Sequence, residues 1–412
     1  MGPDVLAALR RLSGASGVLD ALAAETGVHV VGGAVRDVLL GREPSEVDVV
    51  VVGDAPALAR RLADGTGAEL RVHERFGTAT LSLGPTTFDL ASARRESYPH
   101  PGALPDVELG ASLPEDLERR DFSVNAIAVE IATSRITAHP VAFRDLEARE
   151  LRVLHAGSFG DDPTRLLRLC RYAGRLGFGI EAVTAELAAA ALGAGALATV
   201  SGERIGRELR LAAGDVQPAV AVVLASTGIG AAVLGGFDAD ADLLARALAL
   251  CPPDGRRDLV VLSVAARNEE PASIADRLAA LGFTRDEVDR VQRSVRAASR
   301  LAAFLAAAGA GPPSRVASEL GAEPVEAAAL AGALAGSSEA IDVVRRWLQA
   351  QRHVRPLLDG RDLAAAGLHG PRIGRGLRAA LAVALDDPGA GRDAQLRAAL
   401  AAGGGEPGGS VA

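Results

Sequence analysis

The chain has 412 residues, of which 49% are hydrophobic and 23% are charged. This length and composition predict two or more domains with buried cores, and they exclude a wholly disordered protein. All 44 basic residues are arginine, and 52 acidic residues bring the net charge to −8. A molecule with this charge does not coat nucleic acid along its whole surface, so any surface that binds RNA must be local.

The sequence predicts a protein of the cytoplasm. Cys170 and Cys251 are too few for a disulfide framework, and neither belongs to a CxxC pair. The first residues, MGPDVLAALRRL, carry an early acid and no long apolar stretch, which is unlike a signal peptide. Between Asp215 and Asp238 lie 22 uncharged residues, but five of them are glycine or proline, and the triplet at 226–228 is typical of a turn. We therefore expect two buried helices in this segment and no membrane span.

Strand-like and helical runs alternate over the first third of the chain. Runs rich in Val, Leu and Thr predict strands, and glycines mark where the runs end. The expected strands are 28–33, 47–53, 69–77, 78–84 and 86–93, and the expected helices are 34–41 and 54–67. The stretch from Ala93 to Pro114 has several Pro and Gly and no clear period, so we predict a mobile loop there.

From Pro163 onward the sequence predicts helices. Amphipathic segments rich in Ala and Leu are separated by Pro and Gly, as at 252–253 and 311–313. The expected fold class is an α/β head with a mixed sheet, followed by an all-α neck, body and tail. The expected boundaries are 1–138 for the head, 139–215 for the neck, 216–300 for the body, 301–401 for the tail and 402–412 for a disordered C-terminus.

A glycine pair followed by two acids forms the first candidate site. Gly32 and Gly33 lie between an expected strand and an expected helix, where the backbone can approach a ligand closely, and Arg36 lies in the first turn of that helix. Glu46 and Asp48 are two residues apart at the start of the next strand, so both side chains project from one face. Adjacent carboxylates repel each other unless a divalent cation or a proton lies between them. Singly, each piece is typical of an ordinary turn or a solvated strand end. Together they indicate a site for a metal and a phosphate.

Two further clusters are rich in arginine. RRDFSVNA (119–126) places two arginines at an expected helix start, with Asp121 or Ser123 as its cap. A plain capped helix is the alternative interpretation of this string.

The segment DDPTRLLRLCRYAGR (161–175) predicts a basic helix that begins after Asp162, with proline at its first position. Arg165, Arg168 and Arg171 recur every three residues and share one face, and no acid occurs from 163 to 179. We interpret this face as a binding surface for anions. A solvated basic helix is the alternative.

Several of these strings together resemble one known family. The ordered strings GGAVRDVLLGREPSEVDVVVVGDA, HERFGTATLSL, FDLASARRESYPHPGALP, RRDFSVNAIA and DDPTRLLRLCRYAGRLGF resemble the class II tRNA nucleotidyltransferase/poly(A) polymerase family. This family holds the CCA-adding enzymes and belongs to the polymerase-β-like nucleotidyltransferase superfamily. The resemblance runs nearly continuously over about residues 28–210 and reappears in GPRIGRGLRAAL (370–381).

The resemblance implies a role for each candidate residue. A metal would be held by Glu46 and Asp48, with Asp89 as a supporting catalytic carboxylate. Three groups of residues would hold the nucleotide: Gly32, Gly33 and Arg36 at the triphosphate; Arg120, Asp121 and Asn125 at the ribose; and Asp162, Arg165, Arg168 and Arg171 at the base and the phosphates. Of these, Asp162 and Arg165 match the motif that reads the Watson–Crick edges of C and A, so the protein itself would act as the template.

The activity that the resemblance implies is the addition of C and A, from CTP and ATP, to the 3′ end of tRNA, with Mg²⁺ as cofactor and with neither DNA nor a membrane as partner. The metal would activate the 3′-OH and neutralise charge on the α-phosphate as pyrophosphate leaves. Enzymes that add only CC, only A or poly(A) share these motifs and are alternatives. Glu46 stands where the family has the first aspartate of D-x-D, so a catalytically impaired relative that binds nucleotide or RNA is a further alternative.

Arginines concentrate again near the end of the chain. Eight arginines and two acids lie between Arg345 and Arg378, a local balance of +6 in a molecule of −8. An exposed helix pair is one interpretation. The other is a surface that contacts the phosphates of tRNA, and it predicts binding that weakens steeply with salt.

Overall fold

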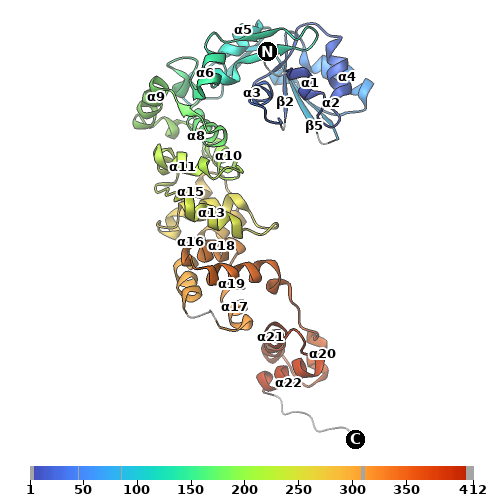
Figure 1. The fold of residues 1–412 in the computed structure, drawn as a ribbon, viewed down its shortest axis with the longest axis vertical. Coiled ribbons are helices and arrows are strands. Elements are labelled where there is room, and N and C mark those ends of the chain that lie inside the picture. The colour runs from blue at the N-terminus through green and yellow to red at the C-terminus, as the bar shows by residue number, and fades with distance from the viewer. Residues whose placement is uncertain (1–3, 45, 85, 308–310, 405–412) are drawn as a thin grey trace. The chain divides into compact units, whose positions relative to one another are not determined.

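The computed structural model describes residues 4–44, 46–84, 86–307 and 311–404 (Figure 1). The chain divides into two compact units, Met1–Glu208 and Leu209–Ala412. The finer division into head, neck, body and tail, with boundaries after 138, 215 and 300, stays a prediction.

A mixed sheet of seven strands forms the centre of the first unit. The strands lie in the order β3-β4-β5-β2-β1-β8-β9, and among these neighbours β2 and β5 pair in parallel while the others pair antiparallel. Their bounds are β1 Val28–Val31, β2 Val47–Val51, β3 Glu69–His73, β4 Thr78–Leu83, β5 Thr86–Ser92, β8 Ile127–Glu130 and β9 Ile136–Ala138. The five strands expected between residues 28 and 93 are confirmed, because β-branched side chains there fit a half-buried pleated surface.

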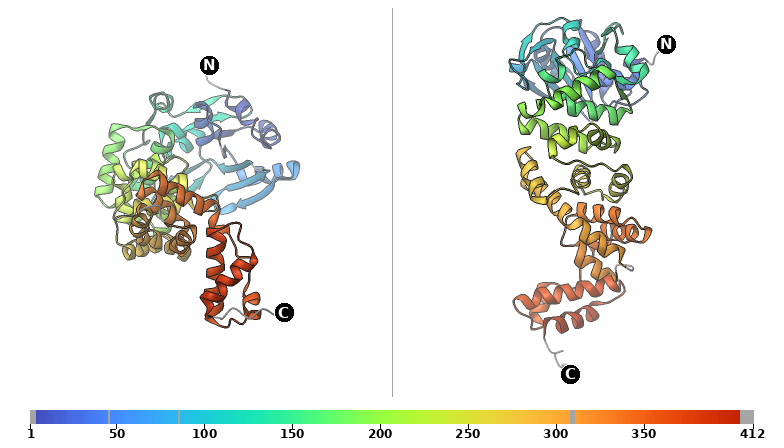
Figure 2. Two further views of the ribbon diagram at one scale, coloured as in Figure 1. Left: turned by 60° about the horizontal axis from the view of Figure 1, so that its bottom comes forward. Right: turned by 90° about the vertical axis from the view of Figure 1, so that its left-hand side faces the viewer.

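Helices α1 (Val5–Leu9), α2 (Ala15–Ala23), α3 (Gly33–Leu39) and α4 (Ala55–Thr66) accompany this sheet (Figure 2, blue). Helix α4 packs on β3, β4 and β5, and α3 packs on β1, β2 and β8. The Asp54 carboxylate accepts the Ala57 N–H at the start of α4, and Gly67 ends the helix in the left-handed conformation (φ +69°).

The predicted mobile loop over 93–114 is wrong in part. Strands β6 (Arg94–Ser97) and β7 (Asp106–Leu109) form an antiparallel hairpin, and α5 (Leu113–Glu118) follows with a Ser112–Glu115 capping box. Arg95 lies opposite Glu108 in the hairpin and also donates to the Glu115 carboxylate of α5 at 2.6 Å. These ion pairs fix a hairpin that has no hydrophobic period to reveal it.

The rest of the first unit is mainly helical. Its elements are η2 Ser123–Asn125, α6 Ala142–Ala148, β10 Glu150–Leu151, α7 Ser158–Asp161, α8 Arg165–Leu176, β11 Gly179–Ile180, α9 Ala182–Gly193, η3 Ala196–Thr199 and the start of α10 (Gly202–Ala213). Helix α8 begins two residues later than predicted, with Thr164 as its N-cap residue. Asp162 does not cap it but accepts the N–H (3.1 Å) and the hydroxyl (2.7 Å) of Thr164, which form a turn before the helix.

The second unit is helical throughout its described residues. Its elements after α10 are α11 Ala219–Ser226, α12 Ile229–Leu234, α13 Ala241–Leu250, α14 Arg257–Ala265, α15 Pro271–Ala280, α16 Arg285–Ala306, α17 Pro313–Leu320, α18 Val325–Ala335, α19 Ser338–Gln349, η4 Gln351–His353, α20 Gly360–Ala365, α21 Pro371–Asp386 and α22 Arg392–Gly403. Helices α16 and α18 pack closely, as do α21 and α22.

The uncharged segment 216–237 forms α11 and α12 with a turn at Gly228 (φ +74°), as expected. No helix in the described ranges is long and apolar enough to cross a membrane. The predicted disordered C-terminus begins inside α22, and its residues 405–412 lie outside the described residues. The expected fold class, an α/β head followed by an all-α part, is confirmed.

Candidate active site

The turn from β1 to α3 brings the backbone against two charged side chains. Gly32 has φ +69° and ψ −131°, which glycine adopts readily and other residues do not. A Cβ on Gly32 would lie 3.0 Å from Nη1 of Arg120 and 3.5 Å from Oδ2 of Asp48. Glycine at this position therefore leaves room for Asp48 and Arg120 beside the turn.

Two carboxylates lie side by side on neighbouring strands. Asp48 of β2 and Asp89 of β5 are register partners, and both are exposed. The Thr80 hydroxyl of β4 donates to Asp89 Oδ1 at 2.6 Å, which holds that carboxylate in place. Although the residue reaches solvent, partial desolvation of its carboxylate by the surrounding protein raises the pKa of Asp48, with Arg120 opposing the rise and Asp89 and Glu46 adding to it.

These carboxylates fit a divalent cation. A cation between Asp48 and Asp89 would relieve the repulsion that raises the pKa of Asp48, and Glu46, exposed just before β2, adds its charge to the same group. The described residues hold no ready-made group of three or more His, Cys, Asp or Glu ligands. Carboxylate oxygens are the ligands that hard divalent cations take, and substrate phosphates and water can complete such a site.

A polar pocket of about 340 Å³ opens beside these carboxylates. Its walls come from the β1–α3 turn, β2, the β6 strand, the end of α5 and helix α8. The lining residues are Gly32, Gly33, Asp48, Arg94, Glu96, Tyr98, Arg119, Arg120, Asp121, Asn125, Asp162, Arg165, Arg168 and Tyr172. Nine of the residues singled out in the sequence are thus brought together here: Gly32, Gly33, Asp48, Arg120, Asp121, Asn125, Asp162, Arg165 and Arg168.

Asp121 is the centre of a hydrogen-bond network in this pocket. Its Oδ1 accepts the Phe122 N–H (2.8 Å) and Asn125 Nδ2 (2.9 Å), and its Oδ2 accepts Nε (3.0 Å) and Nη2 (2.6 Å) of Arg168. Burial opposes ionisation of Asp121, but the Arg168 charge and these hydrogen bonds outweigh it and hold its pKa well below the usual range. The pair is therefore ionised at all physiological pH values.

Arg165 is held on two sides. Its Nη1 donates to Ser158 Oγ (2.6 Å) and its Nη2 to the Arg119 carbonyl (2.8 Å). These bonds fix the guanidinium against the pocket wall opposite the strands. Asp162, beside it, presents a carboxylate edge to the same pocket.

Two predicted nucleotide-binding arginines lie behind the pocket wall. Arg36 is only 2% exposed and donates to Asp37 Oδ1 (2.7 and 2.8 Å) and to Asn125 Oδ1 (2.6 Å). Arg171 lies 5.0 Å from the Tyr172 ring centroid, with Nη2 3.8 Å from Glu208. Arg36 therefore supports Asn125 from behind, and Arg171 supports Tyr172.

The structure adds residues that the sequence did not single out. Asp116 is fully buried and accepts Arg119 Nε (2.9 Å) and Arg120 Nη2 (3.0 Å), so one carboxylate holds both adjacent arginines. The spacing of three and four residues along α5 is the signal that could have identified this pair of contacts.

Both tyrosines of the chain line the pocket. The Tyr98 hydroxyl donates to Glu96 Oε2 at 3.1 Å, and burial together with the Glu96 charge raises the pKa of Tyr98 to about 12. Tyr172 lies edge-on to Phe122, with ring centroids 5.8 Å apart. Tyr98 lies in the stretch predicted to be a loop and Tyr172 lies among helical residues, and neither gave a signal in the sequence.

A second pocket of about 370 Å³ opens on the sheet itself. Asp48, Arg119 and Arg120 line both pockets, while Thr78, Thr80 and Asp89 belong to the second. Asp48 and the two arginines therefore lie between two adjoining spaces, each large enough for part of a nucleotide, and Asp89 faces the second of them.

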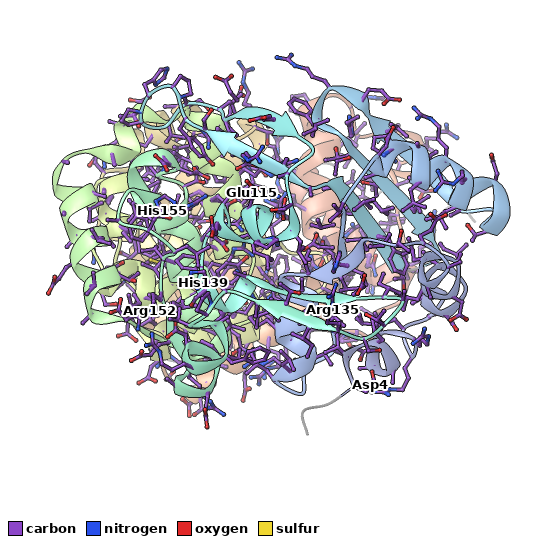
Figure 3. The ribbon with its side chains drawn as sticks, turned by 90° about the horizontal axis from the view of Figure 1, so that it is seen from above. Asp4, Glu115, Arg135, His139, Arg152 and His155 are labelled. Atoms are coloured by element: carbon purple, nitrogen blue, oxygen red, sulfur yellow. The ribbon has the colours of Figure 1, made fainter. Side chains whose placement is uncertain are left out.

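A buried ionic cluster supports the RRDF turn from below. Asp145 of α6 is fully buried and accepts the Ser123 hydroxyl (2.7 Å) and Arg152 Nε (3.0 Å). Arg152 also pairs with Glu181 at 2.7 Å. Figure 3, seen from above, labels Arg152 and, near it, His139, which directly follows β9.

A mixed sheet that presents paired carboxylates next to an arginine-lined polar pocket defines the head of a nucleotidyltransferase. Residues 28–152 match the family model described as "Poly A polymerase head domain". The chain is similar to members of the class II tRNA nucleotidyltransferase/poly(A) polymerase family, within the head and beyond it.

Relatives of this family extend the match beyond the head. The chain is 44% identical over 187 residues to the A-adding tRNA nucleotidyltransferase of Aquifex aeolicus, covering 45% of this chain and 23% of the relative. It is 33% identical over 299 residues to the CC-adding tRNA nucleotidyltransferase of Geobacter sulfurreducens, covering 71% and 62%. Among solved structures, the apo form II of a CCA-adding enzyme superimposes with a TM-score of 0.79 at 25% identity over 97% of this chain and 96% of that one. The matched part spans from about a quarter to about half of the first curated relatives.

Proposed function

We propose that the chain is a template-independent RNA nucleotidyltransferase that adds C, C and A to the 3′ end of tRNA from CTP and ATP. The observation that carries the proposal is that Asp48 lines two adjoining pockets and has Asp89, in the second pocket, as its register partner. One pocket takes the incoming nucleotide and the other takes the 3′-terminal nucleoside of the acceptor. The reacting atoms then meet at the carboxylates.

Different residues of the first pocket bind the phosphates, the ribose and the base of the nucleotide. Arg120 and Arg168 contact the phosphates. Asp121, held by Asn125 and Arg168, accepts a hydroxyl of the ribose, which distinguishes ribonucleotides from deoxyribonucleotides. Asp162 and Arg165 meet the edge of the base.

The transfer itself is an in-line displacement. The acceptor 3′ oxygen attacks the α-phosphorus, the bond to pyrophosphate breaks, and the hydroxyl proton is lost as the new phosphodiester forms. Glu46 and Asp48 would hold Mg²⁺, with Asp89 as a supporting carboxylate, and the metal would supply charge neutralisation for this step. Asp89, whose Oδ1 is held by Thr80, orients the acceptor hydroxyl, and Arg120 stabilises the leaving pyrophosphate.

The body of the tRNA is contacted elsewhere, by exposed arginines of α21. Arg372, Arg375 and Arg378 recur every three residues and are exposed. They form no ion pair with any residue that the structure describes, so their charges are available to phosphates. We place this reaction in the cytoplasm, where tRNA and nucleoside triphosphates are both present.

Primer extension tests the proposal. A tRNA transcript that lacks its three terminal nucleotides is incubated with Mg²⁺ and CTP, ATP or both, using the natural protein and Glu46→Asp. We expect C, C and A to be added in order by the natural protein. If only Glu46→Asp extends the transcript, the extra methylene group of Glu46 is what prevents catalysis in the natural protein. No extension by either protein would contradict the proposal and favour a relative that only binds nucleotide or RNA.

A specialised activity is the second candidate, and the 44% identity over 187 residues to an A-adding enzyme favours it. Such an enzyme would extend a transcript ending in CC with a single A and leave the transcript without CCA unchanged. A CC-adding enzyme would do the opposite and stop after two cytidines.

A further inference from the structure

We infer that Arg204 is a positioning residue that fixes the base-reading carboxylate of Asp162 and ties it to the loop 98–105, so that it helps to select the incoming base. The inference rests on the proposed function and assigns a role to a residue that does not line the pocket. Arg204 lies on α10, 42 positions after Asp162 in the chain.

The guanidinium of Arg204 contacts two segments at once. Its Nη2 lies 2.9 Å from Asp162 Oδ1, and its Nη1 donates to the Gly102 carbonyl at 2.8 Å. The side chains of Arg204 and Asp162 are 26% and 20% exposed, so the pair is largely shielded from water. The planar guanidinium fixes both contacts together, which an ammonium group would not do.

The backbone of the loop 98–105 also contacts the end of α7 and the segment before α10. Gly102 donates its N–H to the Gly160 carbonyl of α7 at 3.3 Å. It has φ +73°, and a Cβ there would lie 2.2 Å from Thr199 Oγ1 and 2.7 Å from the Thr199 carbonyl. Only glycine fits this approach. The loop, the end of α7 and the segment before α10 thus form a closed three-way contact, which we call the Arg204 junction.

The junction decides which oxygen of Asp162 is offered to a ligand. Oδ1 is taken up by the N–H and the hydroxyl of Thr164 and by Arg204. Oδ2 receives no hydrogen bond from any described residue, and Asp162 lines the nucleotide pocket. Arg204 therefore holds Oδ1 on the protein side and leaves Oδ2 for the base.

The orientation of the Asp162 carboxylate discriminates between the bases. Cytosine and adenine carry an amino group on the Watson–Crick edge, which donates to a carboxylate. Uracil and guanine carry a carbonyl at the corresponding position, which a carboxylate repels. A fixed Oδ2 therefore favours C and A and rejects U and G, whereas a carboxylate free to rotate discriminates less.

The first test is Arg204→Ala, with each nucleoside triphosphate measured separately in single-nucleotide extension. We expect kcat/KM for CTP and ATP to fall about tenfold, the effect of one charge-assisted hydrogen bond, while the value for UTP does not fall. The ratio of CTP to UTP use therefore drops. Arg204→Lys keeps the charge without the fork and should give an intermediate ratio. Arg207→Ala is the matched control, because Arg207 is exposed on the same helix.

The second test perturbs the junction from the loop side. Gly102→Ala forces the loop away from Thr199 and should lower the same ratio in the natural background. In the Arg204→Ala background it should add nothing, since one junction has already been opened.

Three outcomes are distinguishable. If the natural protein extends no transcript, the proposed function fails before the junction is tested, and the CTP affinity of the two Arg204 variants, measured by equilibrium binding against UTP, then decides the inference by the same ratio. If Arg204→Ala lowers the use of all four nucleotides alike, Arg204 is merely structural and the inference is overturned. An unchanged ratio, or independent effects of Arg204→Ala and Gly102→Ala, would overturn it as well.

Discussion

At Asp48 the stability of the sheet conflicts with the proposed catalytic role of the carboxylate. Its register partner across the parallel pair is Asp89, and like charges directly opposite each other destabilise a sheet. Arg120 offsets part of this repulsion, and the rest remains in the folded protein. A catalytic role, as the proposed function assigns to it, would explain why the pair is kept at the cost of some stability.

The substitution Asp48→Asn should separate these two contributions. We expect nucleotide incorporation to fall about a thousandfold or more, since several kcal/mol of transition-state stabilisation depend on charge at this carboxylate. The melting temperature should stay unchanged or rise, because one of two repelling charges is removed. Primer extension and thermal unfolding measure the two effects on the same preparation.

Asp64→Asn provides the control for this substitution, because Asp64 is an exposed acid of α4 outside both pockets. It removes the same charge and should leave incorporation at the natural level. Full activity of Asp48→Asn would contradict the proposed catalytic role of Asp48.

Sequence reasoning found the residues of the pocket that lie in compact strings. Gly32, Gly33 and Asp48 occupy one stretch of 17 residues, and the turn and strand that hold them are set by local pattern. Asp116 and Arg204 were missed because their importance comes from contacts. Arg204 meets Asp162 and Gly102 across 42 and 102 positions, and no local period records such a meeting.

At the scale of elements, the second unit joins its helices through buried ionic contacts. Glu287 in the first turn of α16 accepts the Thr284 N–H (2.8 Å), Arg256 Nη2 (2.9 Å) and Arg210 Nη2 (3.4 Å). Thr284 is the N-cap of α16 itself, whereas Arg210 lies on α10 and Arg256 at the start of α14, so one carboxylate links α10, α14 and α16. Burial opposes ionisation, but the hydrogen bonds and the arginine charges lower the pKa of Glu287 from 4.5 to about 2.

This shift predicts how acid affects the second unit. A carboxyl whose pKa is lower in the folded state contributes stability above its unfolded pKa, and this contribution is lost as pH falls from about 4.5 to about 2. The shift corresponds to about 3 kcal/mol. Glu287→Gln should therefore lower the free energy of unfolding at pH 7 by about this amount and flatten its decline below pH 4.5.

Urea unfolding followed by Trp347 fluorescence measures this effect, because Trp347 is the single tryptophan of the chain and is nearly buried in α19. Glu339→Gln, at an exposed acid of the same helix as the probe, is the control and should behave like the natural protein. An equal acid decline in Glu287→Gln and the natural protein would show that other groups carry it.

The hydrophobic pattern of the sequence predicts some of the strands and helices but not others. The five strands of the first third follow from β-branched runs, and the helices α11 and α12 follow from a glycine turn in an apolar segment. The β6–β7 hairpin does not, because it is held by the ion pairs of Arg95 with Glu108 and with Glu115. Its sequence lacks alternation, and Pro and Gly within it resemble a loop. The short strands β8 and β9 were likewise missed, since they complete a sheet whose other strands lie far away in the sequence.

At the scale of the whole molecule, the two pockets of the candidate active site and the exposed arginines of α21 belong to different units. Both pockets with the Asp48–Asp89 pair belong to residues 1–208, whereas the exposed arginines of α21 belong to residues 209–412. Within the predicted stretch 345–378, Arg345 and Arg352 are neutralised by Asp342 and Asp254. Part of the local charge of +6 is therefore used inside the protein. The α21 arginines are exposed and form no ion pair with a described residue, and the same is true of Arg346, Arg355 and Arg361.

This separation predicts that RNA affinity and nucleotide affinity change independently. Arg372→Ala with Arg375→Ala should weaken tRNA binding and reduce the slope of log K against log salt by about 1.5, because each lost phosphate contact removes about 0.7–0.9 of slope. The affinity for CTP should not change. Arg285→Ala with Arg296→Ala, two exposed arginines of α16 without ion pairs to the described residues, removes the same charge and should leave the slope unaltered. Filter binding of tRNA between 50 and 300 mM salt gives both slopes, and equal slopes for the two double variants would mean that net charge, rather than α21, attracts the RNA.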